Sequence, residues 1–184
     1  MEIKISTKTV LKILAIFSWI IFIGLCIEAG GIIFNAFYTL AINSEGAKNF
    51  WMKANLSNLY QFDKVYFSTL TFLMIVVSVF KAILFYLIVK MLHNKQLNLS
   101  QPFNLHVKKF IQNTAYLTIG IGIFSFKASN DVHWYMSKDI TMPDIQSLKV
   151  GGADVWIFMG IVLFVIAQIF KRGIEIQLEN ELTV

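Results

Sequence analysis

Four long apolar blocks divide the chain, and they constrain its fold more than any other feature. They span about residues 10–40, 65–92, 110–127 and 153–172. About 20 apolar residues in helical conformation cross the hydrocarbon core of a bilayer. The alternative, a buried soluble core, fits poorly, because 57% of the residues are hydrophobic, whereas soluble domains average about 45–50%. The sequence therefore predicts one all-α domain over residues 1–184, an integral membrane four-helix bundle.

The start of the first block resembles a secretory signal sequence. Lys4, Lys8 and Lys12 precede an apolar stretch that runs to Cys26. However, Leu25 is not the small residue that a cleavage site requires, and the apolar run is far longer than the 7–15 residues of a signal peptide. We therefore expect a retained first helix. Cys26 is the only cysteine, so an intrachain disulfide is excluded.

Basic residues predict how the helices are oriented. If the N-terminus is cytoplasmic, the cytoplasmic segments hold nine Lys and Arg residues and the opposite loops hold six. The nine are Lys4, Lys8, Lys12, Lys90, Lys95, Lys108, Lys109, Lys171 and Arg172, and the six are Lys48, Lys53, Lys64, Lys127, Lys138 and Lys149. Because cytoplasmic loops are enriched in Lys and Arg, both termini are predicted to be cytoplasmic. The net charge of +5 suits an anionic membrane leaflet, and it predicts no direct nucleic-acid binding, because no separate basic domain exists.

Two charged residues, Glu28 and Lys81, lie inside the apolar blocks. Charged side chains at membrane depth are costly and generally face the bundle interior or a cavity. Counting from Lys12 and from Lys90 at 1.5 Å per residue puts Glu28 about 10 Å deeper than Lys81. A direct pair, a Lys81 that reaches back toward the cytoplasmic side, and a pairing of Glu28 with Lys127 all stay open. We predict that Glu28 and Lys81 form an intramembrane polar anchor.

Small residues around Glu28 predict close packing against another helix. They are Gly24, Cys26, Ala29, Gly30 and Gly31. Cys26 and Gly30 have the spacing of two small residues four positions apart that lets helix backbones approach in membranes. Thr118 and Gly122, in the third block, have the same spacing.

The segments that flank the third and fourth blocks are amphipathic. Pro102 suits the start of a helix, and Lys108 and Lys109 follow within reach of lipid headgroups. The acidic tail, residues 173–184, alternates apolar and polar residues, which is typical of a strand. A continuing helix would instead place Glu175 and Glu179 on one face, and both alternatives stay open.

The four-helix layout, the Pro102-Phe103 pair with its basic lead-in, and the C-terminal stretch GIEIQLENELTV resemble one family. It is the family of bacterial membrane proteins catalogued as domain of unknown function 2975, and the resemblance covers nearly the whole chain. It implies a multi-pass protein of the bacterial inner membrane, with no known activity or catalytic residue. Relatives are often encoded beside a small Cro-type helix-turn-helix repressor, which implies a regulatory partnership with a DNA-binding protein.

Signatures of enzymes are nearly absent from the sequence. His93, His106 and His133 lack the spacing of metal ligands, and no zinc-protease, serine-hydrolase or phosphate-loop motif occurs. We therefore expect a non-enzymatic protein without metal or cofactor, and two classes of function stay open. One is a regulator that binds a cytoplasmic helix-turn-helix protein, and the other is a small transporter or channel subunit with Glu28 and Lys81 near its path. The predicted partner contacts are Pro102, Phe103, Lys108, Lys109, Glu175, Glu179 and Glu181. The sequence leaves the ligand and the oligomeric state open.

Overall fold

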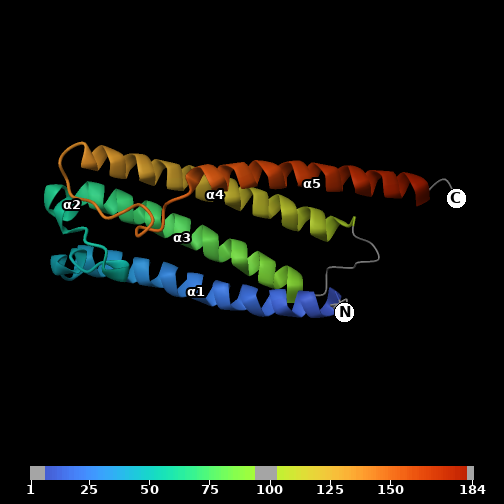
Figure 1. Ribbon diagram of the computed structural model, residues 1–184, viewed down its shortest axis with the longest axis horizontal. Helices are drawn as coiled ribbons and strands as arrows, with labels where there is room; N and C mark the ends of the chain where they lie inside the picture. Colours follow the sequence, from blue (N-terminus) through green and yellow to red (C-terminus); the bar gives the residue numbers. More distant parts are fainter. Residues whose placement is uncertain (1–6, 94–102, 182–184) are drawn as a thin grey trace, which may run out of the picture.

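The computed structural model describes residues 7–93 and 103–181, and this part of the chain is all-helical without a strand. Its elements are α1 (Thr7–Ala41), η1 (Ser44–Ala47), η2 (Trp51–Lys53), α2 (Ser57–Phe62), α3 (Lys64–His93), α4 (Leu105–Met136) and α5 (Ala153–Glu181) (Figure 1). Three of these helices, α1, α3 and α5, are long and apolar enough to cross a membrane. The predictions of an all-helical chain and of membrane-spanning helices are confirmed at this level.

Two helices are longer than the sequence predicted. The block at 110–127 is the centre of α4, which begins at Leu105 and ends at Met136. Its start is fixed by Asn104, whose side chain accepts a hydrogen bond from the backbone N–H of Val107 at 2.9 Å. The block at 153–172 is the first part of α5, which continues to Glu181. The described part of the tail is therefore helix, not strand.

The four long helices pack as consecutive antiparallel pairs: α1 with α3, α3 with α4, and α4 with α5. Figure 1 shows them as neighbours in this order, with α1 and α5 at the two edges. Within the described residues α1 and α5 do not form a packed pair, so the helices form an open row instead of a closed ring. Both edge helices expose apolar side chains, among them Phe17 and Phe34 in α1 and Phe158 and Val165 in α5.

The buried core lies mainly at one end of the row, which we call the loop end. It is formed by residues 42–63 and 137–152, and the opposite end, where α1 and α4 begin and α3 and α5 end, is the terminal end. Core side chains from both loop-end segments meet the helices there: Phe50, Leu56, Leu59, Phe67, Leu70, Tyr135, Ile140, Leu148 and Val150. The segments between the long helices are thus packed structure and not merely connecting loops.

Residues 137–152 fold back along the helices before α5 begins (Figure 1). The hydroxyl of Ser129 donates to the backbone oxygen of Val150 at 3.3 Å. Ala153 then starts α5 beside Gly122, where an added Cβ would lie 3.1 Å from the Ala153 carbonyl oxygen. Gly122 lies about 20 Å from the end of α4, at 1.5 Å per residue. The start of α5 is therefore near the middle of the row.

Candidate functional site

Lys81 projects from the middle of α3 and binds the segment that folds back. Its ammonium group donates a hydrogen bond to the backbone oxygen of Lys149 at 2.8 Å, and it lies 5.9 Å from the ring centroid of Trp156 in the first turn of α5. Lys149 has a left-handed backbone with φ of 62°, a conformation that costs a non-glycine residue about 1–2 kcal/mol. Lys81 therefore connects α3 both to residues 137–152 and to the start of α5.

Glu28 of α1 lies in the same layer as Lys81. Its helical neighbours Cys26, Ala29 and Gly30 line a shallow groove together with Val79 and Ala82 of α3. The half-buried carboxylate is close enough to the Lys81 ammonium to interact electrostatically. Among the described residues, however, Glu28 makes no hydrogen bond and no ion pair within 4.0 Å. The two residues are therefore neighbours in one layer but not a direct pair.

The predicted difference of about 10 Å in depth between Glu28 and Lys81 is wrong. The estimate assumed that Lys12 and Lys90 mark the same level. In the structure α1 extends beyond the end of α3, and Phe22 of α1 packs beside Tyr86 of α3 with 5.9 Å between ring centroids. Lys12 therefore lies well beyond the level of Lys90. No residue count from one helix end could have revealed this offset.

The other predicted partner of Glu28, Lys127, is engaged elsewhere. Its ammonium group pairs with the carboxylate of Asp131 one turn along α4.

Two buried polar atoms near the Glu28–Lys81 layer, Trp51 Nε1 and Ser125 Oγ, have no hydrogen-bond partner among the described residues. The Trp51 ring lies over Gly31, where an added Cβ would be 2.0 Å from it.

The small residues predicted to mediate helix packing divide into two groups. Gly24 and Gly30 have open space where a Cβ would be, with no atom of the described residues within 4 Å of it. Gly122, by contrast, lets α5 approach α4, because a Cβ there would lie 2.9 Å from the backbone nitrogen of Ile157. Gly160 of α5 has the same relation to the nitrogen of Ile119 in α4. The predicted close approach of two helices is therefore seen at Gly122, whereas at Gly30 no described residue makes such a contact.

Most residues predicted to contact a partner lie at the terminal end. Phe103 packs on α5, with its ring centroid 5.3 Å from that of Phe170 and its edge where a Cβ at Gly173 would be. Lys108 donates to the side-chain oxygen of Gln112 at 2.6 Å. Phe103 is thus positioned by α5, whereas Pro102 lies outside the described residues.

The acidic residues of the tail are arranged on the last turns of α5. Glu175 accepts a hydrogen bond from Arg172 at 3.1 Å and lies 3.9 Å from the ammonium group of Lys171. Ile176 and Leu178 nearby are 46% and 54% exposed, and the backbone of Glu179 belongs to the same helix. The side chain of Glu181 lies outside the described residues. The structure therefore brings acidic and exposed apolar side chains together on one helix end.

No cluster of three or more His, Cys, Asp or Glu residues that could hold a metal ion occurs in residues 7–93 and 103–181. His106 and His133 lie near opposite ends of α4, and His93 ends α3. The structural contacts of Lys149, Phe170 and Gly160 were not predicted from the sequence. Lys149 accepts the hydrogen bond from Lys81 through its backbone carbonyl, which no sequence motif identifies. A glycine inside an apolar block, as at Gly160, could have predicted a close helix contact.

Comparisons with known proteins assign this chain to no family. No family model, no curated protein and no solved structure matches it. The resemblance to domain of unknown function 2975 therefore stays a prediction.

Proposed function

We propose that α4 is a fourth membrane span and that both ends of the chain lie in the cytoplasm. The antiparallel packing of α4 between α3 and α5 supports this, because a central helix needs less apolar surface than the helices at the edges of the row. The terminal end carries Lys12, Lys90, Lys109, Lys171 and Arg172. Such an excess of basic residues is typical of the cytoplasmic side. In a bacterium this would be the inner membrane.

The function that the geometry favours is that of a non-enzymatic membrane regulator that binds a soluble cytoplasmic protein through the end of α5. The observation that carries the proposal is the reach of α5, which continues as a helix beyond the ends of the other long helices (Figure 1). Its last turns expose Ile176 and Leu178. An amphipathic helix that presents exposed apolar side chains is a common means of docking into a groove of a partner.

The charge of this helix end indicates the class of partner. Glu175 and Glu179 flank the exposed apolar residues, and Glu181 follows in the sequence. An acidic helix complements a basic protein surface, and DNA-binding domains carry such surfaces. A small helix-turn-helix repressor, the partner that the family resemblance implies, belongs to this class of basic DNA-binding proteins.

A crosslinking experiment in cells tests this proposal. The chain is tagged at its N-terminus, crosslinked, solubilised and purified, and bound proteins are identified by mass spectrometry. We expect a small helix-turn-helix protein to be recovered, and to be lost when Ile176→Ser and Leu178→Ser are combined. The control is Met52→Ser, which changes a 68% exposed apolar residue at the loop end. Recovery that is equal from both variants, or that contains membrane proteins alone, would contradict the proposal.

A second candidate, a small transporter or channel subunit, has one observation in its favour. Glu28 and Lys81 share a layer within two of the candidate membrane spans, and ionisable residues at such depth often mark transport paths. The bond from Lys81 to Lys149 argues for an anchor instead, because the ammonium group is already engaged. Under the transport hypothesis Glu28→Gln stops flux and the tail is dispensable, whereas under the regulator hypothesis the tail is essential.

A further inference from the structure

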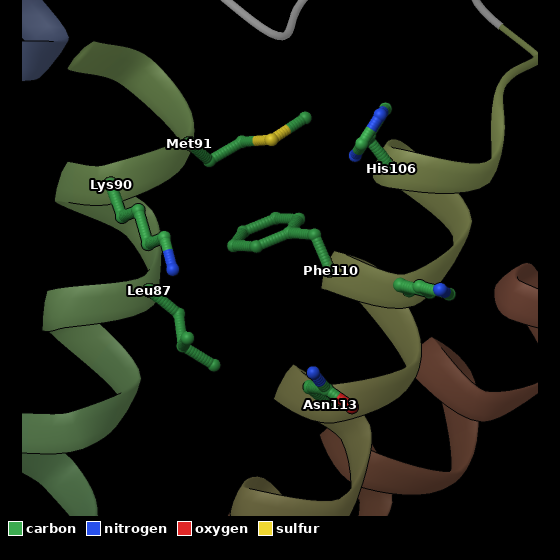
Figure 2. Close-up of a pocket in the computed structure, with 7 residues that line it drawn as sticks. Leu87, Lys90, Met91, His106, Phe110 and Asn113 are labelled. Carbon is green, nitrogen blue, oxygen red and sulfur yellow. The ribbon is translucent and has the colours of Figure 1, made fainter. Parts of the chain in front are cut away.

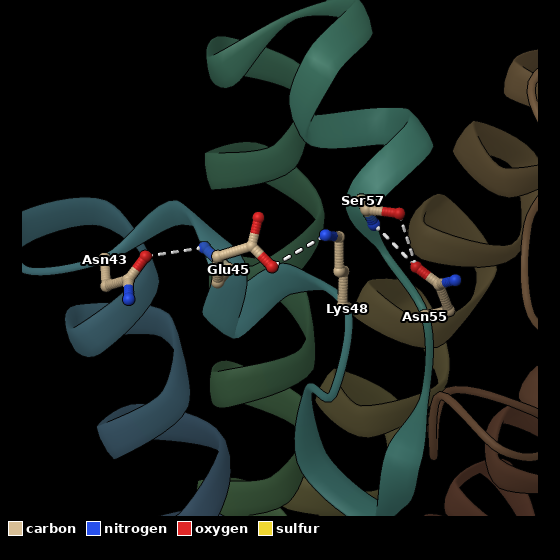
Figure 3. Close-up of polar contacts among 5 residues, drawn as sticks. All are labelled: Asn43, Glu45, Lys48, Asn55 and Ser57. Atoms are coloured by element: carbon tan, nitrogen blue, oxygen red, sulfur yellow. Dashed lines mark hydrogen bonds and ion pairs between the residues drawn. The ribbon is translucent and has the colours of Figure 1, made fainter.

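A small cleft opens between the terminal ends of α3 and α4 (Figure 2). Its volume is about 200 Å³, and its lining includes Lys90 and Met91 of α3 and His106, Lys109 and Phe110 of α4. Figure 2 shows the ammonium group of Lys90 pointing into the space between the two helices, with the Phe110 ring projecting from the opposite side. The cleft therefore combines cationic groups with an apolar wall.

Within the described residues, no acidic side chain pairs with the basic groups that line this cleft. Lys90, His106 and Lys109 are its titratable lining residues, and none of them makes a hydrogen bond or an ion pair within the described part of the chain. Glu175, an acid at the same end, is engaged by Arg172 of its own helix. The cleft lies between the first turns of α4 and the last turns of α3, whose helix dipoles oppose each other, so its basic side chains set its charge. Its electrostatics therefore favour a negatively charged ligand.

The size and position of the cleft restrict the ligand further. Pockets for whole small molecules usually measure about 300–1,000 Å³, so a cavity of about 200 Å³ suits a fragment such as a phosphate group with a few waters at about 30 Å³ each. Lys12, Lys171 and Arg172 lie at the same end of the row, which is the level expected for lipid headgroups. Leu87 and Phe110 extend the lining with apolar surface.

We propose that this cleft binds the phosphate of an anionic phospholipid, with Lys90 and Lys109 contacting the phosphate oxygens. His106 provides a further hydrogen-bond donor, and the partly exposed Leu87 and Phe110 contact the glycerol and the first carbons of the acyl chains. Basic pockets between membrane helices bind anionic headgroups by this chemistry. The inference needs only that the terminal end lies at a membrane surface, and so it is independent of any soluble partner.

The test uses the purified full-length protein in micelles that contain phosphatidylglycerol or phosphatidylcholine, with bound lipid counted by native mass spectrometry. We expect phosphatidylglycerol to be retained in preference to phosphatidylcholine. The double variant Lys90→Gln, Lys109→Gln should bind phosphatidylglycerol about 25-fold more weakly, from roughly fivefold for each lysine near an anionic headgroup. The matched control, Lys53→Gln with Lys138→Gln at the loop end, removes the same charge and should bind as the unmodified protein does.

Each remaining outcome decides between specific alternatives. Equal loss of lipid from the control pair would show general charge attraction and would overturn the site. Displacement of the lipid by glycerol phosphate at matched phosphate concentration would show a soluble phosphate ligand and would overturn the lipid. If the double variant loses its helical circular dichroism, the single change His106→Leu, which removes the hydrogen-bond donor of an exposed residue, provides the test, and undiminished binding by that variant would contradict the proposal.

Discussion

At the scale of single residues, the bond between Lys81 and Lys149 connects positions 68 apart in the chain. The acceptor is a backbone oxygen, which no substitution removes. Replacing the lysine therefore leaves this carbonyl without its donor and also removes the cation from the Trp156 ring. Hydrogen bonds that involve a charged group contribute about 1.5–3 kcal/mol to stability.

We expect Lys81→Met to lower the free energy of unfolding by about 2 kcal/mol. Thermal unfolding of the purified protein in detergent, followed by circular dichroism, measures the change. The exposed Lys53 at the loop end provides the matched control, and Lys53→Met should leave the unfolding temperature unchanged.

A complementary substitution changes the other side of the same bond. Lys149→Gly keeps the carbonyl oxygen and removes the Cβ that makes a φ of 62° costly. This variant should be more stable by about 1 kcal/mol in the same unfolding experiment. A stability loss in Lys149→Gly as large as that in Lys81→Met would contradict the assignment of the effect to the hydrogen bond.

The arrangement of Glu28 and Lys81, which lie in one layer, could be predicted only in part from the sequence. Glu28 and Lys81 were identifiable because a charge inside an apolar block is conspicuous in any sequence. Their common level was not, because it depends on how far α1 slides past α3, and that offset is set by side-chain packing such as Phe22 on Tyr86. The partner of Lys81 was hidden as well, since every residue carries a backbone oxygen.

At the scale of elements, α4 and α5 are held together by reciprocal glycines. Gly122 accommodates the backbone of α5 at Ile157, and Gly160 accommodates the backbone of α4 at Ile119. Close backbone approach of this kind provides the van der Waals contact that associates helices in membranes, where no hydrophobic force acts between them.

The Gly122→Ala variant should lose about 1–3 kcal/mol of stability, as overpacked interfaces do. The added Cβ would meet the rigid backbone nitrogen of Ile157 at 2.9 Å, so α5 must shift. Gly24→Ala is the matched control, because nothing lies within 4 Å of its Cβ position, and it should stabilise α1 by about 0.5–1 kcal/mol. Equal unfolding temperatures for the two variants would refute the close contact.

The elements themselves were predicted well where they are apolar and poorly where they are not. The cores of α1, α3 and α5 follow from the length of their apolar blocks. The amphipathic lead-in from Asn104 was predicted to be helical, and Asn104 caps α4. The apolar block at 110–127 alone, however, was too short to give the bounds of this helix. Residues 137–152 have no regular period, so no pattern indicated that Ile140, Leu148 and Val150 are buried.

At the scale of the whole molecule, the proposed crossing of α4 sets which residues face each side of the membrane. His106 lies near the start of α4 and His133 near its end, and both are exposed. If α4 is a span, these two positions lie on opposite sides. The open row of helices could not be predicted, because which helix packs on which depends on shape and not on composition.

Cysteine labelling in intact cells tests this topology. In a Cys26→Ala background, we expect His133→Cys to react with a membrane-impermeant maleimide added outside. His106→Cys should react only after the cells are permeabilised, as should Lys171→Cys at the end of α5. Labelling of both α4 positions from the same side would show that α4 does not cross.

The row arrangement also bears on how the protein is made. Helices α3, α4 and α5 each pack on the long helix that precedes them along the chain. If the helices enter a membrane in this order, each of the three meets a neighbour that is already in place. Domains that form during synthesis in this order avoid long exposure of unpaired surfaces. Packing of α5 on α4 brings residues 137–152 back along the helices (Figure 1), and the Lys149 carbonyl then reaches the ammonium group of Lys81 on α3.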